Sequence, residues 1–246
     1  VILEVLGRIR ADGAVYKAID FTGSYVEKLN VAGRMTICNM AVEMGAKTAY
    51  MQPNADVLNY VDKRAVRPYE VQFTDPDFQY EESYVFDVSK IEPNLACPSS
   101  VENVHPLSEV VANGPIKLNQ GYIGSCTGGR VEDIAIAAKI LKGRHIPEYT
   151  RLIVVPASNE VMQECMKAGY IQDLMNAGAT ITTPGCGACL GAHEGILAPG
   201  EVCITSTNRN FPGRMGSTEA LMYLASPATV AASMVNGCIT DPRDFL

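Results

Sequence analysis

The stretch NQGYIGSCTGGRVEDIAIAAKILKG, residues 119–143, decides the fold class of this 246-residue chain. Its first part, 119–125, predicts a short strand that runs into a glycine-rich turn. From Val131 onward, apolar residues recur on one helical face, acidic residues occupy the first turn and Gly143 follows the end, so we expect a helix over 131–143. A strand followed by a helix of this length is typical of a βαβ unit.

The same alternation continues in both directions from this stretch. Toward the C-terminus, the patterns predict strands at 151–156, 179–183 and 202–206, and helices at 159–169, 171–177 and 226–237. Toward the N-terminus, they predict helices at 1–9, 33–44 and 55–64, and strands at 15–21, 48–51 and 84–88. This order predicts an α/β fold with two α/β/α domains and largely parallel sheets.

The regular pattern loosens between residues 67 and 115, where six prolines and scattered acidic residues occur. We therefore place an inter-domain connection within about 92–118. The expected domains are 1–105 and 106–246.

Composition and charge narrow the classes of function. Hydrophobic residues make up 47% of the chain and the formal net charge is −7, so a sizeable core is expected and a basic surface for nucleic acid is not. Apolar runs such as VILEVL and LIVVP are far shorter than a membrane span, and no targeting signal is recognisable. We expect a cytoplasmic protein that binds neither nucleic acid nor membrane.

Three of the eight cysteines, Cys126, Cys186 and Cys189, lie in glycine-rich turns, whereas the other five are scattered singly among apolar residues. This distribution favours metal or redox chemistry over a disulfide framework. In GSCTGGR (124–130), the thiol of Cys126 lies at the start of a helix, where the helix dipole lowers its pKa. A tight glycine turn with an incidental cysteine is the alternative.

The C-x-x-C step in PGCGACL (184–190) is compatible with a zinc site, an iron–sulfur cluster or a redox dithiol. A zinc site would need a fourth ligand, and the nearby candidates are His193 and Cys203. The step alone does not choose among these three.

A dense group of hydrogen-bond donors occurs in TNRNFPGR (207–214). Arg209 and Arg214 could each bind a carboxylate through two hydrogen bonds, and Asn208 could bind a cluster sulfur or a substrate oxygen. The alternative is a solvated surface loop.

Asn39 and Glu43 lie four residues apart in TICNMAVEMGA, and therefore on one face of the expected helix, among apolar neighbours. Polar groups on such a face need partners. From spacing alone, a structural hydrogen-bonding pair is favoured over a catalytic one.

The ordered set GSCTGGR, PGCGACL and TSTNRNFPGRMG (205–216) resembles the aconitase superfamily. The segments GRMTICNMAVEMGA and ADVLNYV also resemble its second domain. The similarity runs from Val1 to Ile239 and is greatest to the archaeal-type large subunits of 3-isopropylmalate dehydratase and homoaconitase. It implies the second and third domains of a large subunit, without the N-terminal domain that carries further active-site residues in the family.

The resemblance implies that Cys126, Cys186 and Cys189 hold a 4Fe–4S cluster with one open iron that acts as a Lewis acid. The implied activity is that of a hydro-lyase of leucine biosynthesis. It interconverts 2- and 3-isopropylmalate by dehydration and rehydration, with no net redox change.

Further roles follow from the same resemblance. Arg209, Arg214 and Asn208 match substrate-binding residues, and Asn39 and Glu43 match active-site residues of the second domain. The implied partners are a small subunit, in a heterodimer or heterotetramer, and a hydroxy-dicarboxylate or tricarboxylate substrate. The chain alone is expected to be inactive.

One position departs from the family pattern. Gly128 stands where the family turn, GSCTN, has an asparagine, so one asparagine contact is missing.

Three alternatives to isopropylmalate dehydratase remain open at this point. The first is a homoaconitase large subunit acting on homocitrate and homoisocitrate. The second is a cluster-free relative that senses metal or binds RNA, and the third is a zinc or redox protein that uses only the C-x-x-C step.

Overall fold

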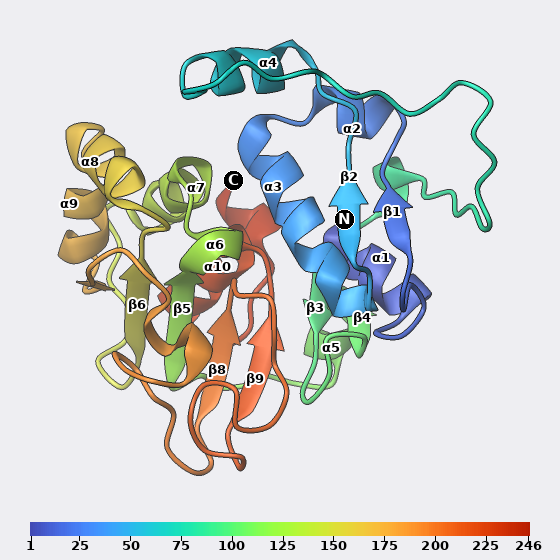
Figure 1. Cartoon of the computed structure of the whole chain (residues 1–246). Coiled ribbons are helices and arrows are strands. Elements are labelled where there is room, and N and C mark those ends of the chain that lie inside the picture. Colours follow the sequence, from blue (N-terminus) through green and yellow to red (C-terminus); the bar gives the residue numbers. More distant parts are fainter.

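The computed structural model describes residues 1–246, and it has the α/β architecture that the alternating patterns predict (Figure 1). A seven-stranded sheet forms the larger part, and a second sheet of two strands belongs to the N-terminal part. The expectation of largely parallel sheets is confirmed for the larger sheet.

The strand order of the large sheet places the functional loops. In spatial order the strands are β4 (Val104–Pro106), β3 (Asn94–Ala96), β9 (Leu221–Leu224), β8 (Val202–Thr205), β5 (Gln120–Gly124), β6 (Arg151–Val155) and β7 (Thr180–Ile181). The five strands from β9 to β7 are parallel, whereas β3 pairs antiparallel with both β9 and β4. Because β5 and β8 are neighbours, their carboxyl ends lie side by side.

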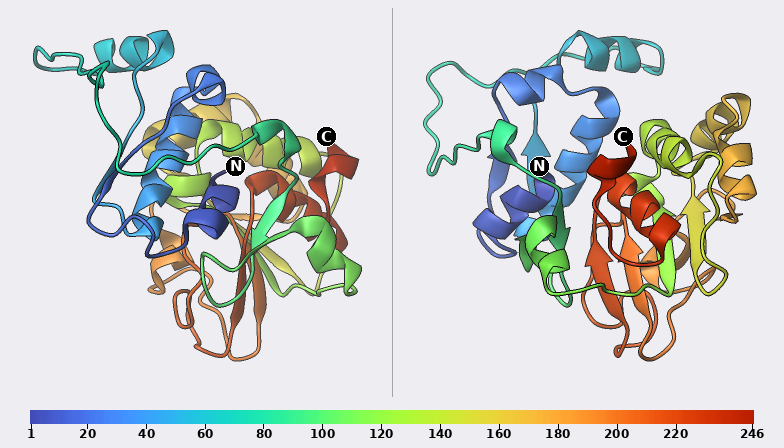
Figure 2. Two further views of the ribbon diagram at one scale, coloured as in Figure 1. Left: turned by 90° about the vertical axis from the view of Figure 1, so that its right-hand side faces the viewer. Right: turned by 180° about the vertical axis from the view of Figure 1, so that it is seen from behind.

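Different parts of the chain cover the two faces of this sheet. Successive side chains of each strand point to opposite faces. Ile123, Val154 and Ile204 belong to the main core, which also includes residues of α7 (Val131–Leu141), α8 (Asn159–Lys167), α9 (Tyr170–Asn176) and α10 (Pro227–Asn236). The right-hand view of Figure 2 shows α7 and α10 on this face. On the other face, Tyr122 and Cys203 pack against side chains from long loops, among them Ala188, Leu197 and Met215.

The N-terminal part is built on one pair of parallel strands, β1 (Ala18–Asp20) and β2 (Thr48–Tyr50). Around them lie α1 (Ile2–Ile9), α2 (Ser24–Lys28), α3 (Val31–Met40), the 3-10 helix η1 (Ala41–Met44) and α4 (Ala55–Asp62). The side chain of Asn30 caps α3 by accepting from Gly33 N at 2.9 Å. Gly45, with φ 84°, ends η1 in the left-handed conformation that glycine adopts readily. The remaining short elements are η2 (Val88–Lys90), α5 (Leu107–Ala112), α6 (Ser125–Gly128), η3 (Gly187–Leu190) and η4 (Pro242–Phe245).

The prediction of a strand at 84–88 is wrong. Residues 63–87 contain no helix or strand, and the side chain of Val85 is 84% exposed. The carbonyl of Val85 accepts from Arg8 Nη1 at 3.1 Å, and the ring of Phe86 lies 5.0 Å from the Arg8 guanidinium carbon. Phe86 also packs against the N-terminal core, and no strand pairs with this segment, which is a loop along that core.

The segment 92–118, expected as an inter-domain connection, contains β3, β4 and α5. Strands β3 and β4 extend the large sheet beyond β9, and the expected boundary between residues 105 and 106 falls within β4. The division into 1–105 and 106–246 stays a prediction. Strand β9 was not predicted, because its four residues follow a long irregular loop without a clear strand pattern.

No helix combines the length and the apolar character that crossing a membrane requires.

The first turn of α7 holds a carboxyl group whose titration should affect stability. Asp133 Oδ2 accepts from the backbone N–H of Arg130 at 3.0 Å. Burial raises the pKa of Asp133 to about 6, although the hydrogen bond from Arg130 opposes this shift. Between the normal pKa of 3.8 and about 6, the folded chain holds a proton that the unfolded chain has lost. This carboxyl therefore lowers stability as the pH rises through that range.

We predict that Asp133→Asn becomes more stable than the wild type as the pH rises from 4 to 6. The gap should reach up to about 3 kcal/mol and then stay constant, because asparagine keeps an acceptor for Arg130 but does not ionise. Urea unfolding at several pH values measures the gap. Glu148→Gln, which removes an exposed charge that takes no part in the pKa shift of Asp133, is the control for net charge. A gap that does not change between pH 4 and 6 would contradict the prediction.

Candidate functional site

Three loops that follow parallel strands form the candidate site. One begins with α6 directly after β5, the second runs from β7 to η3, and the third, 206–214, follows β8. From β5 the chain continues to β6 on one side, whereas from β8 it continues to β9 on the other. In parallel sheets, ligands bind at such a switch point, outside the carboxyl ends of the strands.

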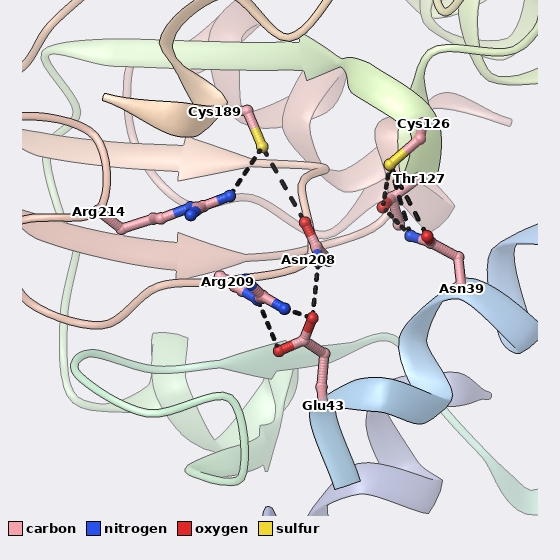
Figure 3. Close-up of polar contacts among 8 residues, drawn as sticks. All are labelled: Asn39, Glu43, Cys126, Thr127, Cys189, Asn208, Arg209 and Arg214. Carbon is pink, nitrogen blue, oxygen red and sulfur yellow. Dashed lines mark hydrogen bonds and ion pairs between the residues drawn. The ribbon is translucent and has the colours of Figure 1, made fainter. Parts of the chain in front are cut away.

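The loop after β5 carries Cys126 and packs against α3. Asn39 Nδ2 donates to Thr127 Oγ1 at 2.8 Å and lies 3.6 Å from Cys126 Sγ (Figure 3). The hydroxyl of Thr36, one turn earlier on α3, donates to the carbonyl of Thr127 at 3.0 Å. The helix that carries Asn39 is thus fixed against the cysteine loop.

Close packing explains the glycine at position 128, where the resemblance led us to expect an asparagine. A Cβ atom at Gly128 would lie 2.3 Å from Ser206 Oγ and 2.6 Å from the carbonyl oxygen of Ser206. The loops after β5 and β8 therefore touch at this point, and a side chain there would push them apart.

The second loop carries Cys186 and Cys189 around η3. The hydroxyl of Tyr122, a fully buried residue of β5, donates to the carbonyl of Cys186 at 2.7 Å. Cys186 is exposed, whereas Cys189 is buried, with its thiol 4.0 Å from Asn208 Oδ1 and 3.9 Å from Arg214 Nη2. Burial raises the pKa of the Cys189 thiol, and the neighbouring guanidinium of Arg214 opposes this shift.

The third loop is joined to the N-terminal part by Glu43. Its Oε1 accepts from Asn208 Nδ2 at 2.7 Å, and its two carboxylate oxygens accept from Arg209 Nε at 2.9 and 3.0 Å. The side chain of Glu43 is only 8% exposed, so this charged pair is largely withdrawn from water, while Arg209 remains 35% exposed. Asn208 contacts Glu43 on one side and Cys189 on the other.

The structure brings seven of the eight predicted site residues into two contact groups, drawn in Figure 3. Asn39 and Cys126 form the first, together with Thr127. The second contains Glu43, Asn208, Arg209, Cys189 and Arg214. The eighth residue, Cys186, lies on the same loop as Cys189 and is held through its backbone by Tyr122.

Buried polar atoms without partners gather at these loops. Of five such atoms in the chain, four belong to the loops after β5 and β8, namely Ser125 Oγ, Arg130 Nε, Asn210 Oδ1 and Arg214 Nε. Three of these four are hydrogen-bond donors, and each buried group left unpaired costs about 1–3 kcal/mol. Buried acceptors bound at these loops would satisfy the three donors. The sulfurs of an iron–sulfur cluster are acceptors of this kind, so the residues present fit such a group.

The arrangement does not form a site for one metal ion. No three His, Cys, Asp or Glu side chains converge closely enough to hold a single ion. His193 lies 3.5 Å from Glu194, and Cys203 is fully buried, with its pKa raised to about 12 by burial. In a multi-iron cluster each thiolate binds a different iron, so the cysteines stand further apart than the ligands of one ion.

Several residues of the site were not singled out from the sequence. Thr36 and Thr127 join α3 to the first cysteine loop. Tyr122 supports the second cysteine loop. Ser125 and Ser206 lie where the loops after β5 and β8 meet. Thr127 and Ser125 flank Cys126 in GSCTGGR, so their place in this motif could have marked them as site residues. Tyr122 gives no such signal, because its role depends on which loop covers its face of the sheet.

The sequence matches the aconitase family (aconitate hydratase) over residues 1–237. This match covers both the α/β fold and the cysteine-bearing loops at the carboxyl edge of its parallel sheet. The chain belongs to the aconitase family.

Its curated relatives include large subunits of two kinds. The chain is 51% identical over 249 residues to the 3-isopropylmalate dehydratase large subunit 1 of Methanopyrus kandleri, and 47% identical over 243 residues to the 3-isopropylmalate dehydratase large subunit of Hydrogenobaculum sp.. These matches cover 100% and 99% of this chain and 58% and 57% of the relatives. It is also 49% identical over 243 residues, 99% of this chain and 56% of the relative, to the probable methanogen homoaconitase large subunit of Methanothermobacter thermautotrophicus. The chain thus spans well under two thirds of the length of these relatives.

The contacts of Glu43 lead to a test of the join between the N-terminal part and the third loop. We predict that Glu43→Ala lowers the free energy of unfolding by about 1–3 kcal/mol, because it leaves Asn208 and Arg209 without their acceptor. A double-mutant cycle with Arg209→Ala, measured by urea unfolding, should give a coupling energy of about 0.5–3 kcal/mol.

The exposed pair Lys142–Asp173, at 3.0 Å, provides the control, since exposed ion pairs contribute only about 0–1 kcal/mol. If the cycle for Glu43 and Arg209 gives no coupling, the two side chains are not paired in solution.

Proposed function

We propose that this chain forms the cluster-binding part of a hydro-lyase, in which Cys126, Cys186 and Cys189 hold a 4Fe–4S cluster. The observation that carries the proposal is the set of unpartnered buried donors on the loops after β5 and β8. The first of these loops carries Cys126, and the second contacts Cys189 through Asn208 and Arg214. The family membership supports the same cofactor.

Bound there, a cluster with one iron free of protein ligands supplies a Lewis acid for removal of a hydroxyl group. The chain itself supplies carboxylate binders. Arg209 donates to Glu43 through Nε alone, so its two terminal nitrogens remain free to bind a substrate carboxylate through parallel hydrogen bonds. Arg214, whose Nη2 lies 3.9 Å from Cys189 Sγ, would bind a carboxylate next to the cluster.

Glu43 and Asn39 would orient the reacting part of the substrate from the N-terminal side. Asn208 and Arg209 fix the carboxylate of Glu43, which can therefore accept a hydrogen bond from the substrate hydroxyl without reorganising. The amide of Asn39 lies beside Cys126 Sγ, where it can donate to the thiolate. Because both residues lie on α3 and η1, their positions depend on the packing of this helix against α6.

The proposed reaction is the interconversion of 2- and 3-isopropylmalate in leucine biosynthesis, carried out with a small subunit. The names of relatives from Methanopyrus kandleri and Hydrogenobaculum sp. support this substrate, and the words "large subunit" in those names support the partner. Homoaconitase activity on homocitrate is the second candidate, because the relatives from two methanogens, at 49% and 48% identity, have that name.

Assays of the complete protein with its small subunit distinguish the two substrates. We expect dehydration of isopropylmalate with a kcat/KM at least tenfold above that for homocitrate. A preference for homocitrate would support the second candidate. No turnover of either substrate by a preparation that contains the cluster would overturn the proposed function.

A test of the cofactor uses metal content. After anaerobic reconstitution of the complete protein, we expect about four iron and four sulfide per chain. Serine at Cys126, Cys186 or Cys189 should reduce this content severely, because each thiolate is one of only three protein ligands.

Cys238→Ser is the matched control, since Cys238 is a half-buried thiol outside the three loops, next to Thr240. It should retain the iron and sulfide content of the wild type. One zinc per chain without sulfide in the wild type would contradict the cluster.

A further inference from the structure

The side-chain amide of Asn210, in the third loop, bridges strands β3 and β9. These strands pair with each other at one position only, Ala96 with Leu224. Asn210 Nδ2 donates to the carbonyl of Cys97, directly after β3, at 2.8 Å, and to the carbonyls of Ala96 and Met222 at 3.3 Å. The amide thus supplies hydrogen bonds between two strands whose own pairing is confined to a single position.

This contact lies in the interior of the protein. Asn210 is only 2% exposed, and Ala96 and Met222 are buried as well. A buried carbonyl oxygen without a partner is unfavourable, so the amide stabilises this part of the sheet. Because Asn210 Oδ1 has no partner, the amide acts here through its N–H groups alone.

The third loop depends on such side-chain contacts at residues 208–210. The backbone N–H and C=O groups of these three residues take part in no hydrogen bond, either with other backbone groups or with side chains. Asn208 and Arg209 contact Glu43 (Figure 3), whereas Asn210 alone contacts the sheet. The amide of Asn210 is therefore what fixes the backbone of this segment to the strands.

Arg209 is the residue next to this anchor. Its guanidinium has Glu43 as its only hydrogen-bond partner, and an arginine side chain has many rotamers. With that ion pair alone, the loop could still turn about Glu43. The anchor at Asn210 fixes the adjacent backbone, and it therefore determines where the two terminal nitrogens of Arg209 point.

We propose that Asn210 is a positioning residue that holds Arg209 in the orientation in which its guanidinium binds a substrate carboxylate. This inference rests on the proposed function, in which Arg209 binds the substrate. Because the carboxylate is bound before and during the reaction, loss of the anchor should raise KM and leave kcat nearly unchanged. The effect should also disappear when Arg209 itself is removed.

The first test measures the kinetics of Asn210→Ala in the complete protein with its small subunit. The shorter side chain leaves room for a water molecule that can bind the three carbonyls, so we expect the variant to fold. If it does not, Asn210→Ser, whose hydroxyl keeps one donor, takes its place. For the substrate that the wild type converts, KM should rise about three- to tenfold, with kcat within about twofold. In the Arg209→Ala background, the same substitution should change kcat/KM by less than about twofold.

A second test does not depend on turnover. Urea unfolding gives the coupling energy between Glu43 and Arg209 from a double-mutant cycle. In the Asn210→Ala background, this coupling energy should fall by about half or more, because the loop no longer holds the guanidinium against the carboxylate.

Asn94→Ala is the matched control. Asn94 is a buried asparagine on β3, and its Nδ2 donates to Glu4 Oε2 at 3.0 Å. This variant should also melt at a lower temperature than the wild type, because it leaves a buried carboxylate oxygen without its donor. It should keep the KM of the wild type and the full coupling between Glu43 and Arg209.

Three results would overturn the inference alone. The first is an unchanged KM in Asn210→Ala, and the second is an unchanged coupling between Glu43 and Arg209. The third is an equally large effect of Asn210→Ala on kcat/KM when Arg209 is absent, which would mean that the amide supports only the fold. A wild type that converts neither substrate would instead overturn the proposed function, and the unfolding cycle would still decide whether Asn210 holds Arg209.

Discussion

The pairing of β5 with β8 is the constraint on which the rest of the site depends. These strands are far apart in the sequence, yet they are parallel neighbours, so the loops that carry Cys126 and Asn208 begin side by side. The contact between Gly128 and Ser206 shows how closely the two loops approach. The second cysteine loop joins them because Tyr122, also on β5, holds the carbonyl of Cys186.

The N-terminal part completes this arrangement through one helix. Asn39 reaches the first loop and Glu43 the third, so two residues one helical turn apart contact both sides of the switch point. The buried carboxylate of Glu43 is offset by Arg209 and Asn208, which makes the join specific, since no apolar side chain could replace it without leaving those donors unpaired. Motion of α3 relative to the sheet would therefore alter both contact groups together.

The fold class could be read from the sequence because alternating strand and helix patterns are local signals. The eight candidate site residues came from the family resemblance, since glycine-rich turns and four-residue spacing alone left structural interpretations open, and their roles stay a prediction. The prediction of a strand at 84–88 could not be judged locally, since a strand needs a pairing partner elsewhere in the chain and this segment has none. Strands β3 and β4 were missed for a related reason: their place in the sheet is set by pairing with β9. Asn210 was overlooked because the three carbonyls that its amide contacts come together only in the folded chain.

In the proposed function three thiolates hold four irons, which leaves one iron different from the other three. Mössbauer spectroscopy of the complete protein, reconstituted with ⁵⁷Fe, tests this most directly. We expect two components in a ratio of about three to one, and only the minor component should change when isopropylmalate or homocitrate is added. Four equivalent irons, or a spectrum that neither substrate changes, would rule out this arrangement of the cluster.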